Sequence, residues 1–114
     1  MKDDRERLRH IIGAMSRIEK YARSGEEVFR RDELIQNWMV RHLQIIGEAA
    51  RALSPSLRAR YPEIPWSDII GMRHVLVHDY FGIDLDIVWR VISADIPRLK
   101  ERIESIVSGL DEGP

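Results

Sequence analysis

The chain has no cysteine among its 114 residues, which excludes a disulfide framework, a thiol nucleophile and a cysteine-based zinc site. That absence also suits a reducing cytoplasm. The net charge is only −1, so no global positive field marks a nucleic-acid binder, and any RNA contact must use a local patch. No apolar run approaches the roughly 20 residues that span a bilayer. The charged start, residues 1–7, lacks the apolar core of a signal peptide, and we expect a cytoplasmic protein with no membrane contact.

What the chain does contain is the composition of a helix-rich globular protein, with 44% hydrophobic and 32% charged residues. Its length predicts one domain, which we place at residues 1–110, followed by a frayed tail at 111–114. Apolar residues recur every three or four positions in four long segments, which is typical of amphipathic helices. No strand-like alternation interrupts them. The pattern therefore predicts an all-α fold, an antiparallel helix bundle with short connectors.

Turn and cap residues divide these segments. Gly25 ends the first helix, in a place where glycine is favoured because it tolerates a left-handed backbone. Ser54 caps a short helix that Pro55 opens. Pro97 falls inside the last helix and should kink or split it near Ser93, because proline removes a helical hydrogen bond. The first predicted helix covers about 4–23. The second starts between residues 26 and 31 and runs to about 53. The others cover 55–60, 66–78 and 85–110.

Arg73, His78 and Tyr80 are the main chemical candidates, and they lie at or just beyond the end of the helix predicted at 66–78. A guanidinium, a group that titrates near neutrality and a phenol provide the elements of a polar site. On a straight helix Arg73 and Tyr80 share a face, whereas His78 points about 140° away from Arg73. Convergence within one chain therefore needs the helix to end or distort near His78, while a site built by two chains does not. Purely structural roles, including a core tyrosine, fit the three residues equally well.

The histidines raise the question of a metal. His74 and His78 are four residues apart, which places two imidazoles on one helix face at metal-ligand spacing. No third histidine or carboxylate stands at a useful spacing, and Asp79 points elsewhere on an ideal helix, so we predict no metal site. His42 falls on the apolar stripe of the second long helix and is expected in the core or at a subunit interface. His10 is expected in solvent.

The polar side of the second long helix carries further charges. Glu48 lies there, and four arginines lie on or just beyond it: Arg41, Arg51, Arg58 and Arg60. A solvated face with Glu–Arg pairs is the favoured interpretation, although one or two arginines could add phosphate contacts beside Arg73. The tryptophans, at positions 38, 66 and 89, occupy helix-packing positions and are expected in the core.

The spacing Arg73-x4-His78-x-Tyr80 resembles the RX4HXY signature of the HepT-like toxins of the HEPN superfamily. The likeness covers nearly the whole chain, with further matching segments at 45–50, 64–66, 78–82, 88–89 and 95–99. One departure is His74, which directly follows the motif arginine where the family commonly has asparagine. If that asparagine orients the substrate or the catalytic histidine, His74 must take over its role.

The resemblance implies a HEPN-like bundle, a homodimer with the motif helices facing each other, and a metal-independent ribonuclease toxin without a cofactor. Arg73 would hold the scissile phosphate and stabilise its added negative charge. His78 would take a proton from a ribose 2′-hydroxyl or protonate the leaving oxygen. His74, Asp79 and Glu48 are candidates for supporting the substrate or the site.

The resemblance also implies a type VII toxin–antitoxin pair. The partner would be a minimal nucleotidyltransferase of the MntA type, which uses ATP and magnesium to transfer AMP onto Tyr80 and so silences the toxin. An alternative from a different class is a non-catalytic helical protein that only binds a nucleotidyltransferase, with the motif as a docking and modification surface. The nearly neutral net charge favours this alternative slightly.

Overall fold

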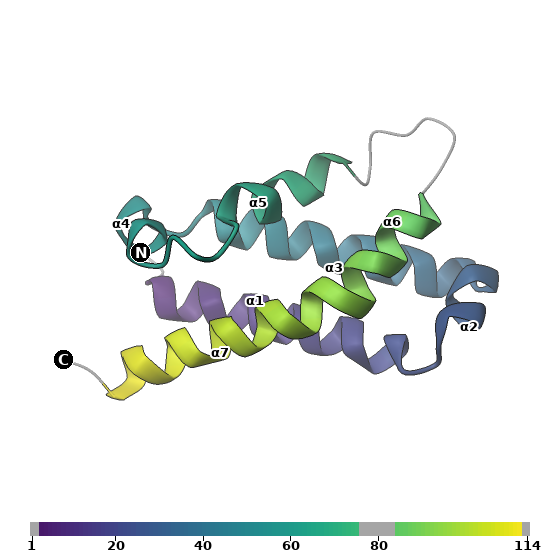
Figure 1. Ribbon diagram of the computed structural model, residues 1–114, viewed down its shortest axis with the longest axis horizontal. Coiled ribbons are helices and arrows are strands. Elements are labelled where there is room, and N and C mark those ends of the chain that lie inside the picture. The colour runs from purple at the N-terminus through teal and green to yellow at the C-terminus, as the bar shows by residue number, and fades with distance from the viewer. Residues whose placement is uncertain (1–2, 76–83, 113–114) are drawn as a thin grey trace.

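The computed structural model describes residues 3–75 and 84–112, and every regular element in these ranges is a helix. Successive long helices run in opposite directions, with α3 beside α1, α5 on α3, and α7 across α1 (Figure 1). The predicted all-α class is therefore confirmed. None of the helices in these two ranges combines the length and apolarity that crossing a membrane requires. The elements are α1 (Asp4–Ala22), α2 (Glu26–Arg31), α3 (Glu33–Arg51), α4 (Pro55–Arg60), α5 (Trp66–Val75), α6 (Leu85–Arg90), the π-helical segment η1 (Val91–Asp95) and α7 (Ile96–Glu112).

The core forms where the apolar stripes of α1, α3 and α7 meet, as their periodicity predicts. His42 is 8% exposed, and its Nδ1 lies 2.8 Å from the Trp38 carbonyl oxygen, so its predicted core placement is confirmed. Trp66 is also buried, whereas Trp38 and Trp89 are half-buried against the core. The side chains with no exposure at all include Leu8, Ile11, Met15 and Ile18 of α1, Met39, Leu43 and Ile46 of α3, and Ile96 and Ile103 of α7.

The second long helix is divided at Asp32, so the prediction of one helix to about residue 53 was wrong. Asp32 has an extended backbone, with φ −109° and ψ 104°. Its carboxylate accepts hydrogen bonds from the backbone N–H groups of Leu34 at 2.9 Å and Ile35 at 3.3 Å. A side chain that accepts from the unpaired N–H groups of a first turn favours the start of a new helix there, so the helix before Asp32 ends.

The last predicted helix stays helical over residues 85–112, but near Ser93, where a kink or a split was predicted, it changes to the π-helical segment η1. Pro97 has no N–H, and its ring would collide with a carbonyl one turn earlier in a regular α-helix. The chain meets this by widening to a π-helix over Val91–Asp95, directly before the turn that holds Pro97. Ile96 donates its N–H to the Val91 carbonyl, and the Ser93 hydroxyl donates to the Trp89 carbonyl at 2.6 Å.

The two ends of the described chain lie together. Arg9 Nη2 donates to both carboxylate oxygens of Asp111 at 3.0 Å, and Arg5 Nε lies 3.2 Å from the same carboxylate. Arg5 also donates to the Leu110 carbonyl at 3.1 Å. Helix α7 accordingly continues through Glu112, two residues beyond the boundary expected at 110.

Candidate functional site

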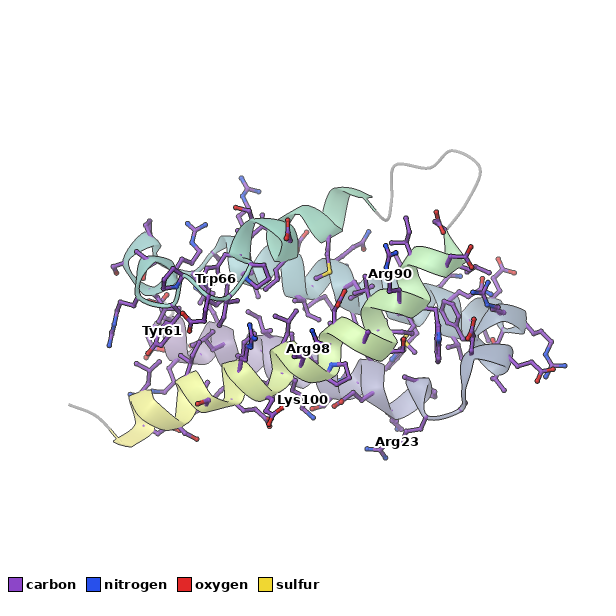
Figure 2. The ribbon with its side chains drawn as sticks, viewed as in Figure 1. Arg23, Tyr61, Trp66, Arg90, Arg98 and Lys100 are labelled. Carbon is purple, nitrogen blue, oxygen red and sulfur yellow. The ribbon has the colours of Figure 1, made fainter. Side chains whose placement is uncertain are left out.

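Trp66 fixes the start of α5, the helix that carries the motif arginine. Its indole Nε1 donates to the Tyr61 carbonyl at 3.0 Å, and the ring is only 7% exposed (Figure 2). The Pro65 carbonyl accepts the first helical hydrogen bond, from Ile69 N–H at 3.1 Å. A buried anchor and a proline-ended connector therefore set where α5 begins on α3.

The motif residues fall at the end of this helix. The backbone places Arg73 and His74 in the last turn of the described part of α5, Trp66–Val75. Their side chains lie outside what the structure describes, and residues 78–80 of the motif lie outside the described residues altogether. The catalytic roles of Arg73 and His78, the support by His74 and Asp79, and the modification of Tyr80 therefore stay predictions.

The charged residues near α3 are described. Glu48 is exposed on α3, as are Arg41, Arg51 and Arg60 on or beyond it, which agrees with a solvated face. Arg58 is half-buried, and its Nε finds no hydrogen-bond partner within residues 3–75 and 84–112. Within the same ranges, no three carboxylates or histidines gather at metal-binding distance.

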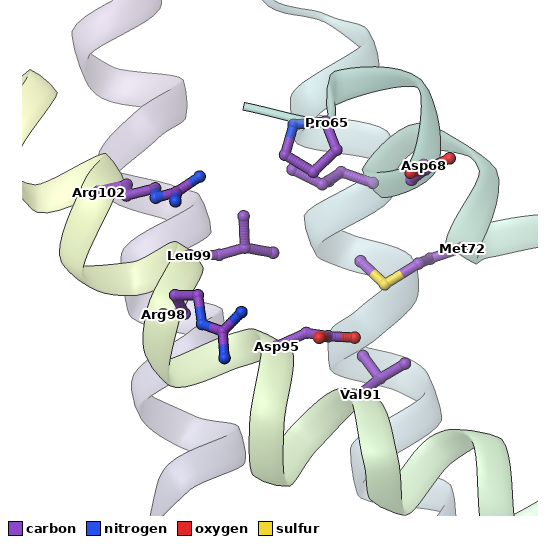
Figure 3. A pocket seen from close by; sticks show the side chains of 9 residues that line it. Pro65, Asp68, Met72, Val91, Asp95, Arg98, Leu99 and Arg102 are labelled. Carbon is purple, nitrogen blue, oxygen red and sulfur yellow. The ribbon is translucent and has the colours of Figure 1, made fainter. Parts of the chain in front are cut away.

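A groove of about 350 Å³ separates α5 from η1 and α7 (Figure 3). Met72, the residue before Arg73, lines the groove, so this hollow leads to the end of α5 that carries the motif. Leu99 points into its middle from α7. The lining is Pro65, Asp68, Ile69 and Met72 on the α5 side and Val91, Asp95, Arg98, Leu99 and Arg102 on the other.

The groove has an apolar floor and a rim with charges of both signs. Asp95 lies beside Met72 and Val91 at the motif end, whereas Asp68 and Arg102 lie toward the Pro65 end (Figure 3). Arg102 Nη1 also donates to the Glu63 carbonyl at 3.4 Å. Within the described residues, no ion pair joins two of the four rim charges. Carboxylates that accept N–H groups and guanidinium groups that bind phosphate are thus both available here.

The α7 wall of the groove is held by contacts with α1, on the side away from α5. Lys100 Nζ lies 2.6 Å from Glu19 Oε1, with both side chains about a quarter exposed, which ties α7 to α1. Arg30 Nη2 lies 2.6 Å from Asp86 Oδ1, and its Nε lies 2.8 Å from Glu26 Oε2. The Arg30–Asp86 pair links α2 to α6. Hydrogen bonds to the carboxylate of Asp86, and to a smaller extent to that of Glu26, raise the pKa of Arg30. These contacts hold one wall of the groove without closing it.

Sequence reasoning missed the rim residues. The sequence assigned the segment 95–99 to the final helical stripe and to the resemblance with the HepT-like family, without a role in a site. The available signal was that Asp95, Arg98 and Arg102 recur at spacings of three and four, on the same side as Leu99. A charged row beside an apolar one predicts a helix face that is not fully covered. Only the fold shows that this face looks toward α5.

Comparison with known proteins places this chain in a family. Residues 11–106 match the family model described as "Ribonuclease HepT-like". The chain is 36% identical over 108 residues to a "Putative RNase" of Caldanaerobacter subterraneus subsp. tengcongensis, covering 94% of this chain and 96% of that one. It is 37% identical over 100 residues to a "Probable ribonuclease HepT" of Thermococcus cleftensis, covering 87% and 91% of the two chains.

A third relative is longer than this chain. It is a "Gamma-glutamylcyclotransferase and putative RNase" of Methanocaldococcus jannaschii, 38% identical over 112 residues, which are 97% of this chain but 50% of that protein. No solved structure matches. Because the family model matches residues 11–106 and two relatives align over nearly their full lengths, the chain belongs to the Ribonuclease HepT-like family.

Proposed function

We propose that this protein is a metal-independent endoribonuclease and the toxin of a HepT/MntA toxin–antitoxin pair. Family membership over residues 11–106 is the observation that carries the proposal. It is supported by two relatives of similar length whose names identify them as ribonucleases. The nearly neutral net charge requires that RNA be held by a local arrangement of cations rather than by the whole surface.

The proposed reaction is internal transfer at an RNA phosphate. The ribose 2′-oxygen forms a bond to phosphorus and loses its proton to His78, while the bond from phosphorus to the 5′-oxygen breaks and that oxygen takes up a proton from water. Arg73 binds the phosphate and stabilises the negative charge that it gains in the transition state. The products are a 2′,3′-cyclic phosphate and a 5′-hydroxyl. The nucleophile belongs to the RNA, so the step needs no metal-bound water.

The proposed site is shared by two subunits. Arg73 and His78 diverge by about 140° on an ideal helix, so two motif helices that meet across a two-fold axis bring one residue from each into reach. His74, Asp79 and Glu48 are proposed to support the substrate or the catalytic histidine. A protein that sediments as a monomer at the concentrations where it cleaves RNA would overturn the shared site.

The direct test is RNA cleavage by the purified protein in EDTA. We expect fragments that end in a 2′,3′-cyclic phosphate, identified by mass, and no stimulation by magnesium. Cleavage that depends on an added divalent ion would instead favour the His74/His78 metal pair. If no RNA is cleaved while a neighbouring nucleotidyltransferase still binds, the non-catalytic alternative holds.

The proposed regulation acts on Tyr80. Transfer of AMP from ATP to its phenol oxygen, with release of pyrophosphate, places a phosphate and a nucleoside beside the motif. The phosphate would compete with RNA for Arg73, and the nucleoside would block access. Incubation with the partner nucleotidyltransferase, ATP and magnesium should raise the mass by whole AMP units on the Tyr80 peptide. Tyr80→Phe should take up none and should stay active, and label at another residue would refute the assignment.

A further inference from the structure

We propose that the groove between α5 and α7 is a subsite for an unpaired guanine of the RNA, with Asp95 reading the base and Arg98 holding a neighbouring phosphate. This inference rests on the proposed ribonuclease function and adds a base preference to it. It uses only described residues, which line the groove next to Met72 and therefore next to the motif arginine in the chain.

The shape and lining suit a flat base. A volume of about 350 Å³ falls within the range of ~300–1,000 Å³ in which small-molecule pockets are found. Ile69 and Met72 on one side and Val91 and Leu99 on the other offer apolar contact to the two faces of an aromatic ring. Proteins that recognise RNA sequence commonly take up such unstacked bases and read their hydrogen-bonding edges.

The carboxylate at the motif end determines which base fits best. A carboxylate is an acceptor with two oxygens, so it matches two neighbouring N–H donors. Guanine alone presents such a pair, N1–H and N2–H, side by side on its Watson–Crick edge. Uracil presents a single N–H between two carbonyl oxygens, which a carboxylate repels. Asp95, grouped with Met72 and Val91 in Figure 3, is therefore assigned the guanine edge.

Arg98 supplies the charge that an RNA strand needs beside this carboxylate. It follows Asp95 by three residues on one helical path, so the two side chains emerge from the same face. A guanidinium binds phosphate through paired N–H donors, which positions the strand without reading its sequence. The two residues thus have separable roles, specificity for Asp95 and affinity for Arg98.

The first experiment maps cleavage in a random single-stranded RNA library in EDTA by sequencing the ends. The wild-type protein should enrich guanine about tenfold at one position beside the cut, the size expected of one paired base contact. Asp95→Asn should remove this enrichment, because an amide presents one acceptor and one donor. Glu101→Gln, an equal charge change at an exposed position of α7 outside the groove lining, should keep it.

Arg98→Gln should instead weaken binding about tenfold for all sequences and lower the salt slope of binding by roughly one unit. The matched control is Arg23→Gln at the end of α1, a residue outside the groove lining (Figure 2). Retained enrichment in Asp95→Asn, or an equal effect of Arg23→Gln, overturns the subsite. So does conversion of a dimer to a monomer by Asp95→Asn, since the groove would then be a subunit interface.

A second measurement does not need cleavage. Of the four methionines, Met72 lines the groove, whereas Met15 and Met39 have no exposure and serve as internal references. With ¹³C-methyl methionine, guanosine 5′-monophosphate should shift the Met72 signal at about tenfold lower concentration than uridine 5′-monophosphate. This shift without RNA cleavage would keep the subsite and refute the proposed function. Cleavage without any Met72 shift would do the reverse.

Discussion

Two sides of this helix bundle differ in how they are closed. Where α1 meets α3 and α7, side chains such as Leu8, Leu43 and Ile103 have no exposure. Where α5 faces α7, a groove of about 350 Å³ remains, and charged side chains share the wall with apolar ones. Both sides are built from amphipathic helices, but the fully buried side chains of the first side are apolar, whereas charged side chains line the second.

The difference teaches how a small bundle can separate stability from binding. Burying an apolar stripe away from water stabilises the folded protein, so such a stripe packs closely against another apolar stripe. Asp95 and Arg98 lose favourable hydration if they are buried without partners, so their face stays open. The closed side can then supply the free energy of folding, while the open side is available to a ligand.

The largest expected effect is a loss of RNA cleavage with little change in stability. Arg73→Ala and His78→Ala should each lower RNA cleavage by about 10²-fold to 10⁴-fold, the range for removing a proton-transfer or charge-stabilising group. The free energy of unfolding in urea should change by less than ~1 kcal/mol for either variant, because both residues are predicted at or just beyond a polar helix end. Undiminished cleavage by one variant would remove that residue from the mechanism.

A pair of leucines tests the closed side against the open side directly. Leu43→Ala should lower the free energy of unfolding by about 3–4 kcal/mol, because it leaves a cavity that the surrounding core cannot fill. Leu99→Ala should cost less, about 2 kcal/mol, because Leu99 is 9% exposed and the lost methyl groups border a groove on one side. Equal losses in urea unfolding would mean that the groove is covered in solution.

Polar contacts at the end of the closed side should matter less. Asp4 accepts hydrogen bonds from Ser54 N at 2.9 Å and Ser54 Oγ at 2.6 Å, which joins the start of α1 to the cap of α4. Asp4→Ala should therefore cost about 1–2 kcal/mol in urea unfolding, since two part-buried donors lose their acceptor. Glu104→Ala, at an exposed position of α7, is the control and should change little.

The smallest effect is expected where the ends of the chain meet. Asp111→Asn weakens the exposed ion pairs with Arg5 and Arg9, which should lower the free energy of unfolding by about 0.5 kcal/mol. Salt screens such pairs, so the difference from the unsubstituted protein should vanish in 1 M sodium chloride. A salt-independent loss would show that these ion pairs do not cause the effect of the substitution.

The sequence by itself determined the features that depend on neighbouring residues. The apolar stripes predicted the all-α class, and Ser54 caps α4 through a hydrogen bond to Leu57 N at 3.1 Å. Gly25 has a positive φ of 94°, as expected, and the irregularity predicted before Pro97 is the π-helical segment η1. The break at Asp32 was missed because a capping residue beside continuing helical periodicity fits either one helix or two.

Only the tertiary structure decided which faces look at one another. Arg98 and Asp95 are ordinary charged residues in the sequence, and they become the rim of a groove because α7 is held by α1 while α5 rests on α3. Residues 65–72 and 91–102 are distant along the chain, and no local pattern states that they face each other. Periodicity fixes the face of each helix, but the choice of partner face depends on how all the stripes are buried at once.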